Sequence, residues 1–196
     1  MNFSEFLQQE GKKVEKNKGE HVFMQGDHDR SFYYVQSGLL KAYYTSDDGK
    51  EFIKSFLLPE DFIGSLASAY SEESCSFGLL CLEQSVLIKI PFKCLYEYSK
   101  NDLELANTLI KRLLHVSMKK EKREYEFLCL SAEDRFSLLE RTHPLLLEKV
   151  TQNDLARYLG LTPVGLSRIK KRLHDNAMHP TTTVASAPFA SGGGSC

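Results

Sequence analysis

A stretch near the C-terminal end of the chain, Thr151 to Leu173, constrains the fold more than any other. Its first apolar residues, Leu155, Ala156 and Leu159, have the spacing of one helical face. Gly160 follows directly and can adopt the positive φ that a tight turn requires at the end of a helix. The stretch therefore predicts a short helix that ends in a tight turn.

A second helix is predicted directly after this turn. Thr162 can cap the free backbone N–H groups, and Pro163 at the first helical position loses no hydrogen bond there. Leu166, Ile169 and Leu173 are spaced to pack against the first helix. Two short helices joined by a tight turn form a helix-turn-helix, so we expect this supersecondary structure over the whole stretch.

The remaining face of the second helix is small near its start and basic toward its end. It comprises Val164, Gly165, Ser167, Arg168, Lys170 and Lys171. From residue 151 to residue 174 the chain has five Lys or Arg residues against one acidic residue. Small side chains let a helix approach base edges in the major groove of DNA, while Arg and Lys can reach guanine or phosphate groups. The pattern favours a DNA-binding helix, and the alternative is an ordinary helical hairpin with a solvated basic face.

The composition, with 42% hydrophobic and 26% charged residues, is typical of a soluble protein of one or two domains. No apolar run approaches the roughly 20 residues of a membrane helix, and the N-terminus does not resemble a signal peptide. We therefore expect a cytoplasmic protein without a membrane partner. The five cysteines have no CxxC spacing and favour free thiols, so we expect no metal and no cofactor. The chain lacks recognisable catalytic motifs, and we expect no catalytic residues and no enzyme.

The segment from residue 14 to residue 98 alternates short β-prone runs with turns. The runs are His21 to Met24, Ser31 to Val35, Leu39 to Thr45, Phe52 to Leu57, Phe77 to Leu82 and Ser85 to Ile90. Asp48-Gly49 is the strongest hairpin signal between them. Short strands at this spacing predict an antiparallel sandwich or barrel. Short helices are expected before it, from Phe3 to Leu7, and after it, from Phe92 to Tyr98.

A long helix is predicted from Asp102 to Phe127, where the chain contains no Gly or Pro. Its apolar residues have a spacing close to a heptad and are Leu105, Ala106, Leu109, Ile110, Leu113, Val116 and Phe127. Such a helix could cover the β domain or pair with a second copy of itself. Its length of roughly 35 Å and the charged run that follows favour a homodimer. A further helix should begin after Ser131 and end at His143-Pro144.

This order of elements resembles the family of the cyclic-AMP receptor protein and the fumarate-nitrate regulator. The motifs that carry the resemblance are Gly19-Glu20 with Phe23 and Gln25-Gly26-Asp27, Tyr34 to Gly38, and Phe62-Ile63-Gly64. The resemblance covers about residues 5 to 174 and implies an α+β fold. Its parts are an antiparallel β-roll (residues 1–100) of the jelly-roll-like, cyclic-nucleotide-binding type, a long dimerisation helix (101–128) and a helix-turn-helix domain (129–175). Residues 176–196 are rich in Ser, Thr, Gly and Pro, which predicts a disordered tail.

The effector cassette departs from the cyclic-nucleotide-binding members of this family. In those members a glutamate after the glycine binds the ribose, and an arginine about ten residues later neutralises the phosphate. Here Gly64 is followed by Ser65, and Cys75-Ser76 stands where arginine and serine are expected. A buried phosphate without its cation is costly, so we expect that cyclic AMP is not the ligand. These four residues are then candidates for the pocket of an unidentified small-molecule effector.

Other interpretations of this pocket stay open at the level of sequence. Side chains such as Leu66, Tyr70 and Phe77 could fill it, so that no effector binds. The iron-sulfur branch of the family requires an N-terminal cysteine cluster, and no cysteine precedes Cys75. A haem ligated by His21, His28 or His115 is a weaker alternative, because lone histidines are usually core or surface residues. Nothing near Cys75 in sequence would activate its thiol, which we expect to be inert.

The second helix of the helix-turn-helix departs from the best-known family members, which place an arginine and a glutamate near its start. Those positions are Pro163 and Val164 here, and only Arg168 matches a later arginine of the family. The DNA-binding residues expected are Arg157, Thr162, Pro163, Val164, Ser167, Arg168, Lys170 and Lys171. Among these, Arg168 is expected to contact guanine, Ser167 and Val164 to lie near bases, and Lys170, Lys171 and Arg157 to contact phosphates.

The resemblance implies a homodimeric transcription regulator that reads a palindromic operator in double-stranded DNA with the helix 162–173. No β-hairpin wing is predicted after this helix, as in the shorter family members. RNA polymerase is a further possible partner. The alternative is a sensor module whose helical end contacts a protein instead of DNA.

Overall fold

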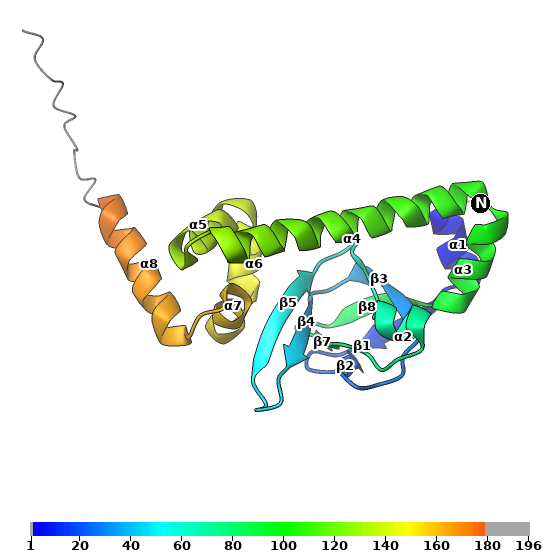
Figure 1. The fold of residues 1–196 in the computed structure, drawn as a ribbon, viewed down its shortest axis with the longest axis horizontal. Coiled ribbons are helices and arrows are strands. Elements are labelled where there is room, and N and C mark those ends of the chain that lie inside the picture. Colours follow the sequence, from blue (N-terminus) through cyan, green and yellow to red (C-terminus); the bar gives the residue numbers. More distant parts are fainter. Residues whose placement is uncertain (1, 179–196) are drawn as a thin grey trace, which may run out of the picture.

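The computed structural model describes residues 2–178 of the 196-residue chain. A β domain lies along one long helix, and a group of short helices lies at the far end of that helix (Figure 1). The β domain contains α1 (Phe3–Glu10), β1 (Lys12–Lys16), β2 (His21–Phe23), β3 (Ser31–Ser37), β4 (Leu40–Thr45), β5 (Glu51–Leu57), β6 (Phe62–Ile63), α2 (Leu66–Ser71), β7 (Gly78–Cys81), β8 (Ser85–Pro91) and α3 (Phe92–Asn101). The helical part contains α4 (Leu103–Cys129), α5 (Ala132–Thr142), α6 (Pro144–Lys149), α7 (Gln152–Leu159) and α8 (Pro163–Met178). The α+β fold predicted from the sequence is confirmed.

The strands form two four-stranded antiparallel sheets, in the orders β1-β8-β3-β6 and β2-β7-β4-β5. A core of buried side chains lies within this domain and includes Phe23, Val35, Leu40, Leu79 and Leu87. Alternation of inward apolar residues along each strand supplies this core. The structure thus has the sandwich that the short, evenly spaced strands predict.

The β4–β5 hairpin is the part of the β domain that reaches the helical part. Leu40 pairs with Leu57 at its base, and Thr45 pairs with Glu51 near its tip. Gly49 in the turn has a φ of +78°, which explains why Asp48-Gly49 marks the turn so clearly in the sequence. β5 packs directly against α7, so the hairpin joins the two parts of the molecule.

Three elements of the β domain are missing from the sequence prediction: β1, β6 and α2. β1 has four charged residues and only Val14 as an apolar residue, so its sequence gives no strand pattern. It nevertheless pairs continuously with β8, from Lys12 opposite Lys89 to Lys16 opposite Ser85. Such a charged strand is suited to the edge of a sheet, where pairing with a neighbour decides its conformation.

Helix α4 begins at a side-chain cap, because Asp102 Oδ1 accepts a hydrogen bond of 3.0 Å from the Leu105 N–H. Leu105 and Leu109 are buried in a core with aromatic residues of α1, β3 and β6. These two residues therefore follow the alternative in which the helix covers the β domain. Ile110, one residue beyond Leu109, is 54% exposed on the other side of the helix. One face of α4 covers the β domain and another is open.

The short helices after α4 share a core with the β domain. Ser131 caps α5 by accepting a hydrogen bond from the Asp134 N–H, as predicted. Pro144 ends α5, but it also opens α6 at the first helical position, a helix absent from the prediction. The buried residues of α5 to α8 include Phe136 and Leu146, and Leu39 of the β domain is buried among them. This shared core holds the helix-turn-helix against the β4–β5 hairpin.

Helix α8 continues past its predicted end at Leu173 to Met178. The boundary at residue 175 is therefore wrong, because residues 176–178 are helical and not part of a tail. No proline or glycine occurs between Leu173 and Met178 to end the helix earlier. The rest of the predicted disordered tail, residues 179–196, lies outside the described residues.

Candidate functional site

The turn between α7 and α8 has the geometry that the sequence predicts. Thr151 caps α7, since its Oγ1 accepts a hydrogen bond of 3.1 Å from the Asp154 N–H. Gly160 ends α7 with a φ of +70°, and its N–H donates to the Ala156 carbonyl. A Cβ at Gly160 would lie 2.9 Å from the Phe127 ring. Both the backbone conformation and the neighbouring ring thus require glycine at this position.

Helix α8 begins with the predicted cap and is anchored through its predicted apolar face. Thr162 Oγ1 accepts a hydrogen bond of 3.1 Å from the Gly165 N–H, and Pro163 is the first helical residue. Leu166 and Ile169 are buried against α7 and α5. The side chains between them consequently point away from the molecule.

The open face of α8 contains four of the predicted DNA-binding side chains: Val164, Ser167, Arg168 and Lys171 are all exposed. Val164 is 61% exposed although its side chain is apolar. Within residues 2–178, Arg168 and Lys171 have no carboxylate partner. This face therefore offers a small N-terminal end and two cations available for a ligand.

Lys170 and Arg157, two of the predicted phosphate contacts, are bonded to other side chains of the protein. The Lys170 ammonium donates a 2.7 Å hydrogen bond to Gln152 Oε1, and its side chain is half-buried against α5. Arg157 Nη1 lies 2.5 Å from Glu51 Oε2 on β5. In this arrangement both side chains hold the helix-turn-helix in place, so a phosphate contact by either of them requires that its present bond is broken.

A buried lysine extends this contact between the helix-turn-helix and the β domain. Lys41 on β4 is 7% exposed, and its Nζ lies 2.9 Å from Asp154 Oδ1 and 3.3 Å from Glu51 Oε2. Asp154 is itself buried and also accepts a hydrogen bond from the Thr151 hydroxyl. We call Lys41, Glu51, Asp154 and Arg157 the interdomain ion cluster. Sequence analysis missed it, because 113 residues separate Lys41 from Asp154.

Arg123 joins α4 to the same region. Its Nη2 donates to the carbonyl of Ile53 on β5 at 3.0 Å and to that of Tyr158 on α7 at 2.8 Å. The guanidinium also lies 3.9 Å from the Tyr158 ring centroid and 4.7 Å from that of Phe127. Burial lowers the pKa of Arg123 from its usual value. One side chain thus connects the long helix, the sheet and the helix-turn-helix, although its charged sequence context resembles a solvated surface.

The predicted effector cassette has no charged group aimed into a pocket. Ser65 is buried, and its Oγ accepts a hydrogen bond of 3.2 Å from the Ser76 N–H. Cys75 is 1% exposed, and its Sγ contacts the Asp29 carbonyl at 3.7 Å. Of the four cassette residues, Gly64 and Ser76 line a cleft, while Ser65 and Cys75 do not.

The alternative that side chains fill the pocket is only partly supported. Phe77 is buried, but Leu66 and Tyr70 are exposed, and the Tyr70 ring packs on Phe92 of α3. A cleft of about 1180 Å³ lies between α4 on one side and β5, β6 and the start of α2 on the other. It is large enough for a small organic molecule.

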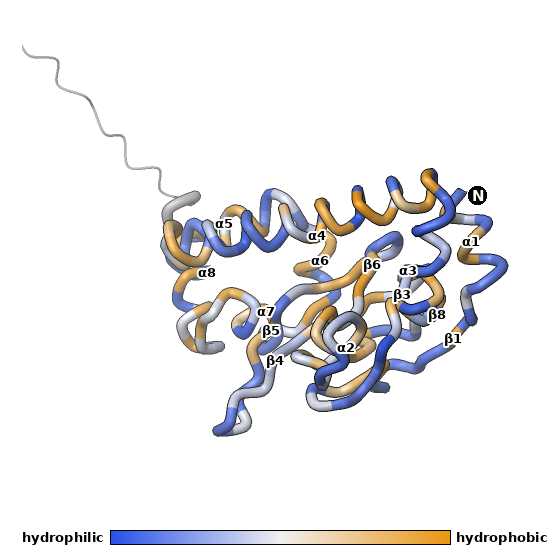
Figure 2. Tube along the Cα trace, turned by 45° about the vertical axis from the view of Figure 1, so that its right-hand side comes forward, coloured by the Kyte–Doolittle hydropathy of each residue, from blue (hydrophilic) through white to orange (hydrophobic). Residues whose placement is uncertain are grey.

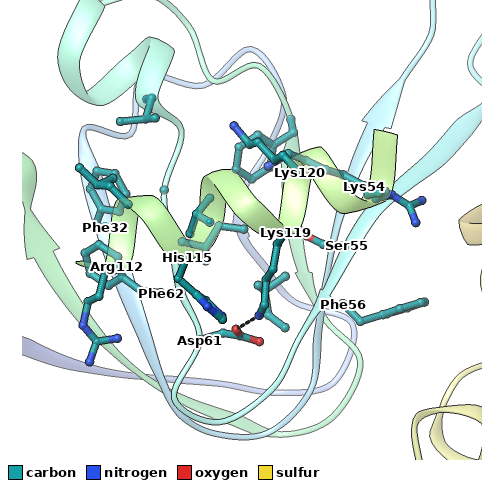
Figure 3. Close-up of a pocket in the computed structure, with 18 of the residues that line it drawn as sticks. Phe32, Lys54, Ser55, Phe56, Asp61, Phe62, Arg112, His115, Lys119 and Lys120 are labelled. Carbon is teal, nitrogen blue, oxygen red and sulfur yellow. Dashed lines mark hydrogen bonds and ion pairs between the residues drawn. The ribbon is translucent and has the colours of Figure 1, made fainter. Parts of the chain in front are cut away.

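The walls of this cleft combine apolar side chains with several cations (Figure 3). Lys119 of α4 is paired with Asp61 at 2.6 Å. Lys54 of β5 and Lys120 of α4 lie close together at another part of the cleft (Figure 3). His115 lines the cleft, while His21 Nε2 lies within 2.8 Å of the Tyr43 hydroxyl. Over residues 2–178, no group of three or more His, Cys, Asp or Glu side chains could hold a metal ion, and no helix could span a bilayer.

The comparisons with known proteins agree with this arrangement. The model of the cyclic nucleotide-binding domain matches residues 13–102. The transcriptional activator protein Anr of Pseudomonas protegens is 28% identical over 172 residues, which cover 82% of this chain and 70% of that protein. The fumarate and nitrate reduction regulatory protein of Vibrio cholerae is 28% identical over 166 residues, which cover 79% of this chain and 66% of that protein. The structure of FixK2 from Bradyrhizobium japonicum has the same fold, with a TM-score of 0.69 and 20% identity over 85% of this chain and 86% of that one.

A cyclic-nucleotide-binding fold joined by a long helix to a helix-turn-helix defines a class of sensory DNA-binding regulators. The order of these parts is shared by the relatives along most of the chain. These findings support a transcription regulator of the CRP/FNR family, the family of the cyclic-AMP receptor protein and the fumarate and nitrate reduction regulator.

Proposed function

We propose that this regulator is a homodimer that reads a palindromic operator in double-stranded DNA through α8. The observation that carries the proposal is the open face of α8, where Val164, Ser167, Arg168 and Lys171 project from a helix whose opposite face is buried. Polar and small groups at a helix start can approach base edges, and the cations beyond can reach guanine or phosphate groups.

The residues of this face have different roles in the proposal. Arg168 contacts guanine, because its side chain is exposed and has no carboxylate partner among the described residues. Ser167 and Val164 lie near base edges, and Thr162 and Pro163 bring the start of α8 into the groove. Lys171 contacts a phosphate. Lys170 and Arg157 do so only after they leave Gln152 and Glu51.

The open side of α4 is the proposed dimer interface. Large apolar side chains recur along it and include Leu103, Ile110, Leu114, Met118, Tyr125 and Leu128. Figure 2 shows apolar residues alternating with polar ones along this helix. Exposed apolar residues spaced by three, four or seven positions lie on one side of a long helix, which is typical of a helix that pairs with a second copy. Two copies paired this way place two α8 helices for the half-sites of a palindrome.

An effector would act through the contacts that join α4, β5 and α7. We call the cleft between α4 and β5 the effector cleft. Arg123 and the interdomain ion cluster connect β5, which lines this cleft, to the helix-turn-helix. Regulation requires that an effector binds the DNA-competent and incompetent arrangements with different affinity. A ligand that changes the distance between α4 and β5 would meet this requirement.

We also expect the protein to work in the cytoplasm, where the operator would be accessible, and to act on transcription through contact with RNA polymerase. A bacterial two-hybrid assay between the full chain and polymerase subunits tests the second expectation. The absence of any interaction in the presence of the operator would leave repression by occlusion as the mechanism.

The DNA-binding proposal is tested by selecting bound sequences from a random duplex pool with the full chain. The selected duplex is then used in fluorescence anisotropy at several salt concentrations, because phosphate contacts make affinity fall steeply with salt. Arg168→Ala should weaken binding by about 1–3 kcal/mol and relax the preference for guanine. The matched control is Lys18→Ala, a lysine of the β domain. A chain that binds no duplex at low salt would contradict the proposal and would favour a protein partner for the helical end.

The dimer is tested separately by light scattering. Leu114→Glu places a charge in the proposed interface and should yield a monomer, while Glu124→Gln on the same helix should leave the dimer intact. A wild-type chain that is monomeric at micromolar concentration would contradict this part of the proposal.

A further inference from the structure

The effector cleft contains more positive than negative side chains. Its cations are Lys54, Lys111, Arg112, Lys119, Lys120 and Arg123, and its acids are Glu60 and Asp61. Two of these cations are already engaged, since Lys119 pairs with Asp61 and Arg123 donates to backbone carbonyls. Lys54 and Lys120 have no carboxylate within ion-pair distance among the residues that the structure describes. The cleft therefore contains positive charge that the protein does not neutralise.

Lys54 lies where the register between β4 and β5 shifts, between Ile53, which pairs with Tyr43, and Ser55, which pairs with Ala42. It is half-buried, and its ammonium lies 4.1 Å from the centroid of the Phe77 ring. Burial lowers the pKa of Lys54 to about 8, and the nearby positive charge of Lys120 contributes to the lowering. A leucine or methionine would fill this position without that cost, so a role in packing does not explain a lysine here.

We propose that Lys54 and Lys120 bind the anionic group of a small organic effector whose apolar body packs against Phe77 and the apolar wall of the cleft. The wall next to these residues includes Ile53, Leu57, Leu113 and Val116. An anion between the two ammonium groups neutralises both, and the aromatic ring is available for the rest of the molecule. This inference rests on the proposed function, because it names the ligand class of the effector cleft.

The proposed site differs from the cassette in which family members hold a cyclic phosphate. Here the cassette serine is bonded within the protein and Cys75 is buried. The positive charge comes instead from β5 and α4, which face each other across the cleft (Figure 3). The anion is therefore held by the sheet and the long helix.

This placement also links the site to the helix-turn-helix. Ile53, the neighbour of Lys54, accepts the hydrogen bond from Arg123, and Arg123 donates to Tyr158 of α7. An anion that draws Lys120 toward Lys54 moves α4 relative to β5 at this junction. The ligand thus acts on the two elements whose contact positions α7.

The test uses the full chain and two fluorescent probes with similar aromatic bodies. 8-Anilinonaphthalene-1-sulfonate carries a sulfonate, and N-phenyl-1-naphthylamine is neutral. Each probe is titrated against wild type, Lys54→Met and Lys120→Met. The controls are Lys93→Met, on α3 and away from the cleft, and Lys13→Met, on an exposed strand. Circular dichroism melting of each variant shows that it is folded.

We expect Lys54→Met and Lys120→Met each to weaken sulfonate binding about tenfold, which corresponds to about 1.4 kcal/mol. Binding of the neutral probe should stay within about twofold, and the controls should change neither probe. An equal loss of affinity for both probes would mean that the cleft binds apolar molecules regardless of their charge, which overturns the proposal. Unchanged sulfonate binding in both variants overturns it as well. Because neither probe assay involves DNA, a failure here is distinct from a failure of operator binding.

Discussion

Replacing Lys54 by methionine should make the ligand-free protein more stable. A pKa of about 8 instead of 10.5 corresponds to about 3 kcal/mol, because each tenfold change in proton affinity is worth about 1.4 kcal/mol. The net gain is smaller, since the ammonium keeps some contact with water and its interaction with the Phe77 ring, about 0.5–1 kcal/mol, is lost. Methionine fills a similar volume without a charge. We therefore expect the free energy of unfolding to rise by about 1–2 kcal/mol at pH 7.

The pH dependence of this gain tests the reasoning more sharply than its size. Between pH 8 and pH 10.5 the unfolded lysine holds its proton while the folded lysine loses it, so the wild type gains stability relative to the variant as pH rises. The difference is fully present below pH 8 and disappears above pH 10.5. Urea unfolding at pH 7.0 and at pH 9.5, followed by circular dichroism, measures it, with Lys13→Met as the exposed control. A variant that is less stable than wild type at pH 7, or a difference that does not shrink at pH 9.5, would refute the argument.

Three further experiments, two with substitutions and one with a ligand, test other parts of the structure. Gly160→Ala forces a positive φ on alanine and a methyl group against Phe127, so it should lower the free energy of unfolding by about 1–3 kcal/mol in urea titrations; a loss below about 0.3 kcal/mol would show that the turn can rearrange. Lys41→Met leaves Asp154 buried without its cation and should lower the free energy of unfolding by about 2–4 kcal/mol. The double variant that also carries Asp154→Asn should recover part of this loss. If the effects of the two single substitutions simply add, the two groups do not interact. Cyclic AMP should give no binding heat in isothermal titration at millimolar concentration, because Ser65 and Cys75 replace the charged cassette residues; micromolar affinity would show that other cations of the cleft replace them.

The helix-turn-helix was predictable because its signals act over short distances in sequence. Thr162 caps a residue three positions later, and Gly160 needs only its own backbone conformation to end α7. The Asp48-Gly49 turn is local in the same sense. For such elements the atoms that decide the conformation are neighbours along the chain. The order of the parts, and with it the family resemblance, follows from these local signals.

The division of α4 into two faces was only half predictable. A run of apolar residues near heptad spacing indicates a helix with partners, but it does not say which residue meets which partner. The β domain takes Leu105 and Leu109 into its core and leaves Ile110 and Leu114 open. The outcome depends on how the helix is rotated over the sheets, which is a property of the packed domain.

The sequence by itself determined the helix-turn-helix, most of the β-strands of the sandwich and the lack of the cyclic-nucleotide residues. Only the tertiary structure decided which charged residues are buried. Lys41, Lys54 and Arg123 all have surface-like sequence contexts, yet each meets groups far away in the chain: Asp154, Lys120 and Tyr158. Burial and electrostatic interaction depend on distance in space. A lysine that appears solvated in a sequence can therefore become part of a buried interdomain ion pair, as Lys41 does, once the β4–β5 hairpin packs against α7.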